Sequence, residues 1–385
     1  MAAIRPRDLL TDSLLDALAG SSVAGPGFDP AGTQPTALIS DIARLAAAGY
    51  LTVALPPEFG GLGCTLRQAA CGQRRLGRRA PRTALAVSAH LYWTGAAADA
   101  YRAGDDSVRW ILLEASRGAL FAGGHGGGTG AAGADLKFAD PRSRCTPTGE
   151  NGCQFADPAV LSTVTPGWDW IAVHGVYQAS RTQSVVAFAG RGDRCTPGFR
   201  VARAEAVGTP ADVFLTSALT WGHGILASVQ YSEARRAFDA ALTSCAEAAA
   251  AALSAGPSAG GPVTGGPVTG SPVTGSPVTG GSSASGPVTG GPVTAGPSAA
   301  GPLRPGSAGR WPVAEAGTQL DAVKARIAEV THAWPLVQDP APDLGGQHLI
   351  GLYAMRHEVA AGTARVHDLI SQITGVPAPA GPLAQ

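Results

Sequence analysis

Apolar side chains recur at helical spacing through the first third of the chain. Over residues 39–47 they fall at intervals of three and four, which places them on one face of a helix closed by Gly49. Prolines 56 and 57 interrupt this pattern, because proline lacks an N–H donor and fixes φ. Thr65 is then a candidate N-cap for a second helix running through Leu76. Two more helices are predicted over 84–102 and 107–116, so residues 1–119 are expected to form an N-terminal helical domain.

The pattern changes after Ala119. Glycines crowd residues 123–133, and short β-branched or aromatic runs follow at 170–176 and 184–189, which predict strands. Residues 196–201 predict a turn that leads into another strand. The sequence therefore predicts a small, reduced β domain over residues 120–208.

Helical pattern returns near Phe214 and continues to Leu253, ending in an alanine-rich stretch of high helix propensity. The motif Pro-Val-Thr-Gly then occurs five times, from Pro262 to Pro287. Proline at this frequency forbids a helix, and a five-residue unit offers no core, so residues 256–310 are expected to be a disordered linker rather than a solenoid. Helices resume at Pro312 and over 349–373, so 209–255 and 311–385 predict a C-terminal helical bundle. The predicted fold class is mostly α with a small central β domain.

Composition narrows the function. The formal net charge is zero, which argues against nucleic-acid binding, and the basic run at 74–79 is interpreted as the solvated end of a helix. No uncharged apolar run is long enough to predict a membrane span. The six cysteines are scattered without metal-finger spacing, and the first residues lack an apolar signal segment. We therefore expect a cytoplasmic protein with no structural metal.

Several segments resemble the acyl-CoA dehydrogenase family. The loop Leu55-Pro56-Pro57-Glu58-Phe59-Gly60-Gly61-Leu62-Gly63, set between two helices, is the least ambiguous of them. The others, in family order, are 48–50, 110–118, 129–136, 152–170 and 372–375. Each motif is moderately specific, and their order and spacing are more specific than any one of them. The resemblance implies the three-part family architecture and an FAD cofactor.

That resemblance also places the flavin contacts. Thr163 occupies the position of a hydroxyl that hydrogen-bonds the flavin ring, and Leu161 replaces a stacking tryptophan. The flavin-contacting positions as a set are Thr129, Gly133, Ala134, Leu161, Ser162, Thr163, Gln372 and Gly375. Several positions in and beside this set differ from the family pattern: Gly130, Ala131, Ala134 and Leu161.

The catalytic carboxylate of the family is missing from the positions that match. The family removes an α-proton with a buried glutamate of raised pKa. Most members of the family carry this glutamate past the point that matches residue 382. Other members carry it early in the first C-terminal helix, at a position that is Gly222 in this chain and is followed by His223. His223 is a weak candidate for a substitute base, since a lone helical histidine is more often structural. His125, in the glycine-rich loop, is interpreted as exposed loop, and that loop lacks a nucleotide-binding pattern.

Three functions follow from this resemblance. The first is an FAD-dependent oxidoreductase for the α,β-dehydrogenation of acyl-CoA or another acyl thioester in lipid or secondary metabolism, with electron-transfer flavoprotein or oxygen as acceptor. The second is a non-catalytic subunit of a heteromeric acyl-CoA dehydrogenase. The third is a flavin-dependent monooxygenase of the same fold, which needs no glutamate base. A homo- or hetero-oligomer is expected in each case.

Overall fold

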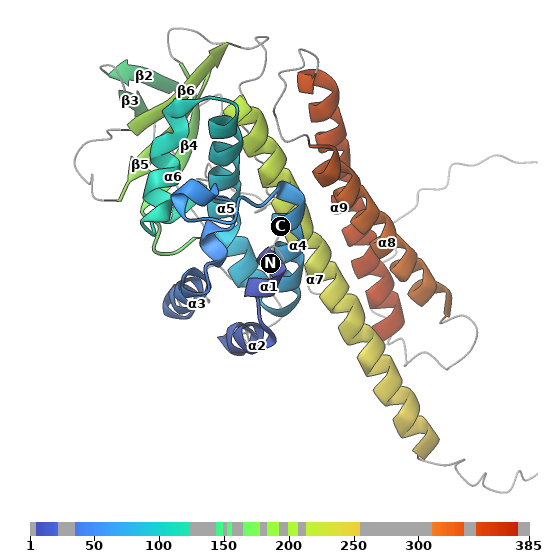
Figure 1. The fold of residues 1–385 in the computed structure, drawn as a ribbon. Coiled ribbons are helices and arrows are strands. Elements are labelled where there is room, and N and C mark those ends of the chain that lie inside the picture. Colours follow the sequence, from blue (N-terminus) through green and yellow to red (C-terminus); the bar gives the residue numbers. More distant parts are fainter. Residues whose placement is uncertain are drawn as a thin grey trace, which may run out of the picture.

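The protein is described from a computed structural model. The structure describes residues 5–21, 35–123, 144–148, 152–155, 165–177, 183–191, 199–206, 213–254, 310–334 and 344–375. In Figure 1 a helical N-terminal part, a small sheet and a group of long C-terminal helices follow one another along the chain.

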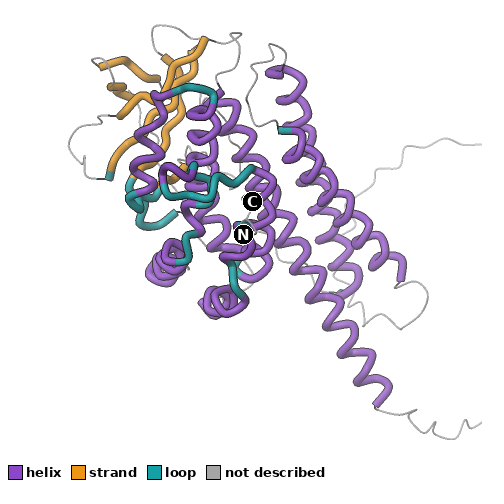
Figure 2. The backbone as a smooth tube through the Cα atoms, viewed as in Figure 1, coloured by secondary structure: helices purple, strands orange, loops and turns teal. Residues whose placement is uncertain are grey.

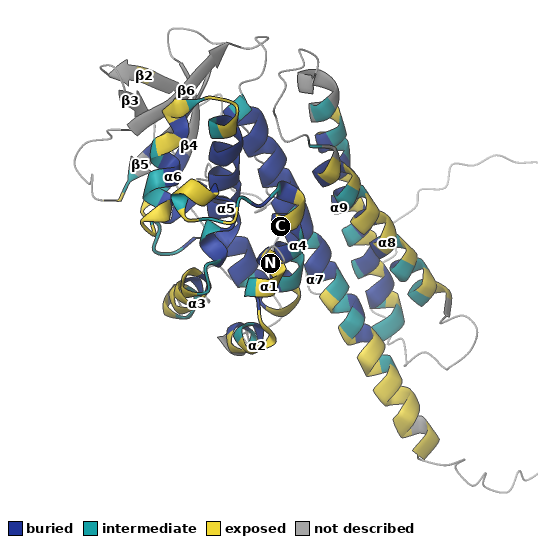
Figure 3. Ribbon diagram, in the orientation of Figure 1, coloured by how far each residue is buried: buried dark blue, intermediate teal, exposed yellow. Residues whose placement is uncertain are grey.

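The N-terminal part is helical, as its periodicity predicts. Its central helix, α5 (Pro81–Arg102), is buried along most of its length (Figure 3) because the other elements surround it. The helices around it are α1 (Pro6–Leu9), α2 (Asp12–Ser21), α3 (Pro35–Ala47), α4 (Leu66–Arg79) and α6 (Arg109–Ser116), with short 3₁₀ turns at Tyr50–Thr52, Pro57–Phe59 and Asp106–Val108. The predicted N-cap is confirmed, because the Thr65 side chain accepts a hydrogen bond from the Gln68 N–H at 3.3 Å.

The proline-rich loop turns the chain tightly between α3 and α4. Gly60 has φ of +80°, which L side chains rarely adopt, and a Cβ on Gly61 would collide with the Leu55 carbonyl. The Gly63 N–H donates to that carbonyl at 2.8 Å, and the Cys64 N–H donates to Val53 O at 2.9 Å. Backbone geometry therefore requires glycine at positions 60 and 61.

The sheet has six described strands and closes on itself. The strands are β1 (Phe121–Gly123), β2 (Arg144–Thr148), β3 (Gly152–Phe155), β4 (Trp170–Tyr177), β5 (Gln183–Gly190) and β6 (Phe199–Ala206). Their order is β1-β4-β2-β3-β6-β5, with β5 paired again to β4. β1 lies parallel to β4 with Phe121 opposite Trp170, and the Asp169 carboxylate beside this register accepts from the Leu120 N–H at 2.8 Å.

Aromatic rings join the sheet to the helices. Phe188 of β5 packs edge-on against Trp93 of α5 at a centroid distance of 5.1 Å and against Trp110 of α6 at 5.4 Å. Phe121 and Phe214 complete the cluster. Because these residues are largely buried, they fix the sheet against the middle of α5 and against α6.

Three long helices form the C-terminal part (Figure 2): α7 (Val213–Ser254), α8 (Arg310–Ala333) and α9 (Leu344–Thr374). α7 packs against α4, α5 and α9, and α8 packs against α9. The last turns of α7 extend beyond these neighbours and are exposed (Figure 3). Among the described helices none is long and apolar enough to cross a membrane.

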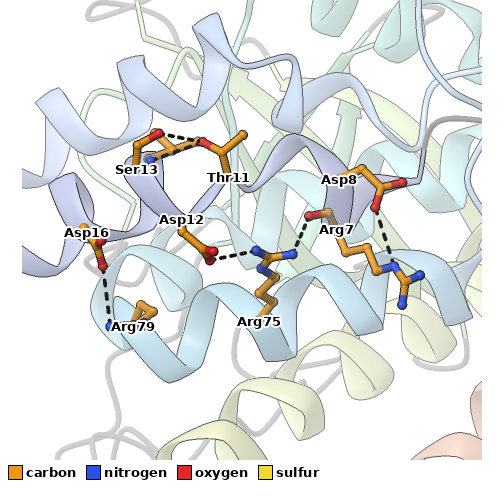
Figure 4. Close-up of polar contacts among 9 residues, drawn as sticks. Arg7, Asp8, Thr11, Asp12, Ser13, Asp16, Arg75 and Arg79 are labelled. Carbon is orange, nitrogen blue, oxygen red and sulfur yellow. Dashed lines mark hydrogen bonds and ion pairs between the residues drawn. The ribbon is translucent and has the colours of Figure 1, made fainter.

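The basic run lies at the end of α4 and its last two arginines, Arg78 and Arg79, are exposed, as predicted; three of its arginines also pair with acidic groups on other helices. Figure 4 shows Arg75 bonded to Asp12 at 2.9 Å and Arg79 near Asp16 at 3.5 Å, both carboxylates belonging to α2. Arg78 pairs with Asp239 of α7 at 2.8 Å. These arginines therefore contact acidic groups that are distant in the sequence.

Candidate active site between α5, α7, α8 and α9

A buried carboxylate lies where four helices meet. Asp99 of α5 is 4% exposed, and its Oδ2 accepts hydrogen bonds from Trp221 Nε1 at 2.7 Å and from Trp334 Nε1 at 3.0 Å. Its Oδ1 accepts from the Arg102 guanidinium at 2.9 Å. Burial raises the pKa of Asp99, and the indole and guanidinium donors oppose that rise. Both oxygens of this carboxylate are therefore occupied.

The sequence positions Trp221 through a glycine on the neighbouring helix. A Cβ on Gly95 would collide with the Trp221 ring, so the absence of a side chain there admits the indole. Gly95 and Asp99 lie one helical turn apart, on the same face of α5. The first therefore makes room for the indole ring and the second accepts its N–H.

A histidine continues the cluster on α9. The His348 ring packs against Trp334 at a centroid distance of 4.7 Å, and His348 Nε2 lies 3.0 Å from Thr220 Oγ1. Burial lowers the pKa of His348 below the ordinary value for histidine. Residues of α5, α7 and α9 and the end of α8 thus form one group, which we call the junction cluster: Asp99, Arg102, Thr220, Trp221, Trp334 and His348.

His223, the candidate base, lies beside this cluster. It is 3% exposed, and its ring packs edge-on against Tyr353 of α9 at 5.6 Å. Tyr353 itself is 48% exposed. The Tyr353 ring thus covers the imidazole of His223. His348 is less deeply buried than His223, because its side chain is only half-buried. A catalytic role for His223 stays a prediction.

Most predicted flavin contacts lie outside the described residues: Thr129, Gly133, Ala134, Leu161, Ser162 and Thr163, together with His125. Gln372 and Gly375 are described and are exposed at the C-terminal end of α9, where Gly375 has φ of +68°. At a rise of about 1.5 Å per residue, Gln372 lies roughly 36 Å along α9 from His348. The structure therefore does not bring these two residues to the junction cluster.

The prediction from sequence missed Asp99, Trp334 and His348. One signal was present, since Asp99 is the single charged residue in the alanine-rich stretch 96–100 of a helix that is buried nearly all round. A buried charge needs partners, so this position could have been marked as part of a polar site. Nothing local identifies Trp334 or His348 as those partners.

Two other ionisable groups, the buried His90 and the partly buried Glu233, lie apart from the cluster. His90 accepts from the Phe121 N–H through Nδ1 at 3.2 Å and contacts Leu51 O through Nε2 at 2.9 Å, which fixes β1 to α5. Burial raises the pKa of Glu233 to about 7. Glu233 lies about 15 Å along α7 from His223, so the two are three turns apart.

The element order and packing define the acyl-CoA dehydrogenase-like fold, as the sequence resemblance predicted. No protein-family model matches the sequence, and no curated protein matches it. Among solved structures, KijD3 in complex with FMN and dTDP-3-amino-2,3,6-trideoxy-4-keto-3-methyl-D-glucose is 18% identical with a TM-score of 0.64, over 100% of this chain and 87% of that one.

Two further structures have the same fold. The nitrososynthase from Micromonospora carbonacea var. africana is 18% identical with a TM-score of 0.63, over 96% of this chain and 86% of that one. The steroid ACAD Tcur3481-Tcur3483 is 16% identical with a TM-score of 0.54, over 96% and 84%. At these identities the likeness establishes the fold.

Proposed function

We propose that this chain is a flavin-dependent oxidoreductase that oxygenates a small polar substrate, the monooxygenase alternative raised by the sequence. The observation that carries this proposal is that both carboxylate oxygens of Asp99 already accept hydrogen bonds. An α-proton is removed by a carboxylate with a free oxygen, and both oxygens of Asp99 already accept hydrogen bonds from Trp221, Trp334 and Arg102. What remains at the junction cluster is an imidazole, which suits proton transfer from a heteroatom.

The donor set around the junction fits a flavin chemically. α7 carries Thr216, Ser217 and Thr220 on its inward face, and these hydroxyls can hydrogen-bond the polar edge of a conjugated ring. A bound flavin, as FMN or FAD, would supply the redox chemistry. The chain's own residues would orient the substrate, exclude water through the aromatic side chains and accept its proton.

The neighbours in fold support this class. KijD3 was crystallised with FMN and an amino sugar nucleotide, and the second neighbour is by name a nitrososynthase. We infer by analogy that the substrate has an amine or hydroxyl group at the reacting position. Oxygen would then be the electron acceptor.

Dehydrogenation of an acyl thioester stays a second candidate, favoured by one observation. Burial gives Glu233 a pKa of about 7, the property that this reaction requires of its base. Its distance along α7 from the junction cluster counts against it, because one substrate would have to reach both.

We also infer an oligomer. If Gln372 and Gly375 contact a flavin, as the resemblance implies, their separation from the junction cluster along α9 means that this flavin belongs to another copy of the chain or to a related partner. Size-exclusion chromatography with light scattering, with and without flavin, tests this inference. A monomer with a full complement of flavin would contradict it.

The absorption spectrum of the purified full-length chain, alone and after addition of FMN or FAD, is the primary test. We expect a bound flavin that, once reduced and exposed to air, incorporates one oxygen atom into an amino sugar nucleotide or a phenol, detected by mass spectrometry. Anaerobic bleaching by an acyl-CoA would instead establish the dehydrogenase. Failure to bind either flavin would reject both enzymes and favour the non-catalytic subunit.

A further inference from the structure

The hydrogen bonds of Thr220 determine which nitrogen of His348 carries the proton. The Thr220 hydroxyl has one hydrogen, and Oγ1 donates it to the Thr216 carbonyl at 2.8 Å. The contact between Oγ1 and His348 Nε2 at 3.0 Å must then be donated by the imidazole. His348 is therefore held as the Nε2–H tautomer whenever its ring is neutral.

The ring is neutral near pH 7. Partial burial lowers the pKa of His348, and no described carboxylate is bonded to the ring to oppose this. Among the described charged and titratable groups of the elements packed around it, Asp99 of α5 is linked to His348 through Trp334, Arg102 is paired with Asp99, and His223 of α7 packs against Tyr353 of α9. Asp99 and Arg102 pair with each other at 2.9 Å, so their charges largely cancel at His348.

The orientation of the ring is also fixed. Trp334 packs against it with the two ring planes tilted by 40°, and the Trp334 indole is itself anchored to Asp99 at 3.0 Å. With Nε2 bonded to Thr220 of α7, the lone pair of the neutral ring is on Nδ1. Within the described part of the chain no hydrogen bond to Nδ1 is formed.

We propose that Nδ1 of His348 is the proton acceptor of this site and takes the proton of a substrate N–H or O–H group. In that step the N–H or O–H bond of the substrate breaks and its electron pair stays on the heteroatom. A bond forms between that proton and Nδ1, and the resulting imidazolium later releases the proton to water. This inference rests on the proposed function, because it specifies which substrate group reacts.

The tautomer is tested without flavin, on the full-length chain labelled with ¹⁵N-histidine. Long-range ¹H–¹⁵N spectra at pH 7 should give His348 a protonated Nε2 and an unprotonated Nδ1, with a pKa below that of free histidine. Thr220→Val should remove this preference and yield a mixture of tautomers. Thr363→Val is the matched control, since Thr363 also donates within its helix, to Val359 O at 2.8 Å, without a histidine partner. A protonated Nδ1 in the unaltered chain would overturn the proposal.

Proton acceptance is tested with phenol, a small aromatic O–H donor. Titration should shift the His348 Nδ1 resonance upfield, in the direction of hydrogen-bond acceptance, and leave the exposed His357 unchanged. His348→Gln should still bind flavin but lose at least tenfold in turnover of any substrate that the oxygenation assay identifies, together with the acid limb of its pH profile. An unchanged Nδ1 resonance, or a retained acid limb, would reject His348 as acceptor while flavin binding still upheld the proposed function.

Discussion

Replacement of Asp99 by alanine should destabilise the protein by about 3 kcal/mol. The Trp221 indole N–H is buried, so leaving it without an acceptor costs about 1–3 kcal/mol. Trp334 is partly buried and the Arg102 side chain is 28% exposed, so water can replace much of the hydrogen bonding that each loses with the carboxylate. Their loss together adds about 1 kcal/mol to the destabilisation. The ionised carboxylate is itself costly to bury, so the loss arises from the orphaned donors rather than from the ion pair.

Asp99→Asn separates these contributions. The amide oxygen can accept both indole hydrogen bonds, while the amide nitrogen would face the Arg102 guanidinium as a second donor. We therefore expect a loss of only about 1 kcal/mol for asparagine. Urea unfolding of the full-length chain, followed by tryptophan fluorescence, measures both variants.

A double-mutant cycle with Trp221→Phe completes the test. Phenylalanine has no N–H to orphan, so Asp99→Ala should cost about 1–2 kcal/mol less in that background. The reasoning would be refuted by an alanine variant within about 0.5 kcal/mol of the unaltered chain, or by asparagine proving as damaging as alanine.

Three further predictions concern a buried histidine, a close helix contact and a helix N-cap. Burial lowers the pKa of His90 to about 4, so between pH 6.5 and 4 the histidine is protonated in the unfolded chain but not in the folded one. The free energy of unfolding should therefore fall by about 3 kcal/mol as the pH drops through that window. A urea midpoint that does not change with pH across the window would contradict this. Gly95→Ala should cost about 1–3 kcal/mol in urea unfolding, because its Cβ collides with the Trp221 ring, whereas Gly317→Ala, with open space around its Cβ, should be neutral or slightly stabilising. Thr65→Ala should lower thermal stability by about 1 kcal/mol through loss of the N-cap, and an unchanged melting temperature would argue against that cap.

Local signals predicted most of the helices and three of the six described strands, β4, β5 and β6, but missed β1, β2 and β3. Thr65 caps the expected helix. The strand predicted at 170–176 is β4, which is one residue longer at its C-terminal end, and the strand predicted at 184–189 is β5, which is one residue longer at each end. Such signals depend on neighbours within about one helical turn or one strand pair, so they survive in a sequence that matches no family model. The boundaries of the three predicted domains stay predictions.

The proline-rich loop carried the fold prediction for the same reason. Its geometry depends on residues that are adjacent in the chain: Gly60 supplies the positive φ, and Gly61 leaves room for the Leu55 carbonyl. The loop therefore indicated where two helices meet. It carried no information about what those helices bury.

The basic run at 74–79 shows the limit of local reasoning. Its place at the exposed end of a helix was predicted correctly, but its ion-pair partners were not predicted. The carboxylates that pair with it, Asp12, Asp16 and Asp239, come from α2 and α7. Only the packing of α4 between these helices brings the opposite charges together.

The sequence by itself thus determined most of the helices, three of the six described strands and, through resemblance, the class of fold. The tertiary structure alone decided the junction cluster, because its hydrogen bonds join residues that are far apart in the chain. Asp99 meets Trp221 across 122 positions and Trp334 across 235, and Thr220 meets His348 across 128. A buried carboxylate must find its donors wherever packing places them, and periodicity within one helix cannot specify a donor on another.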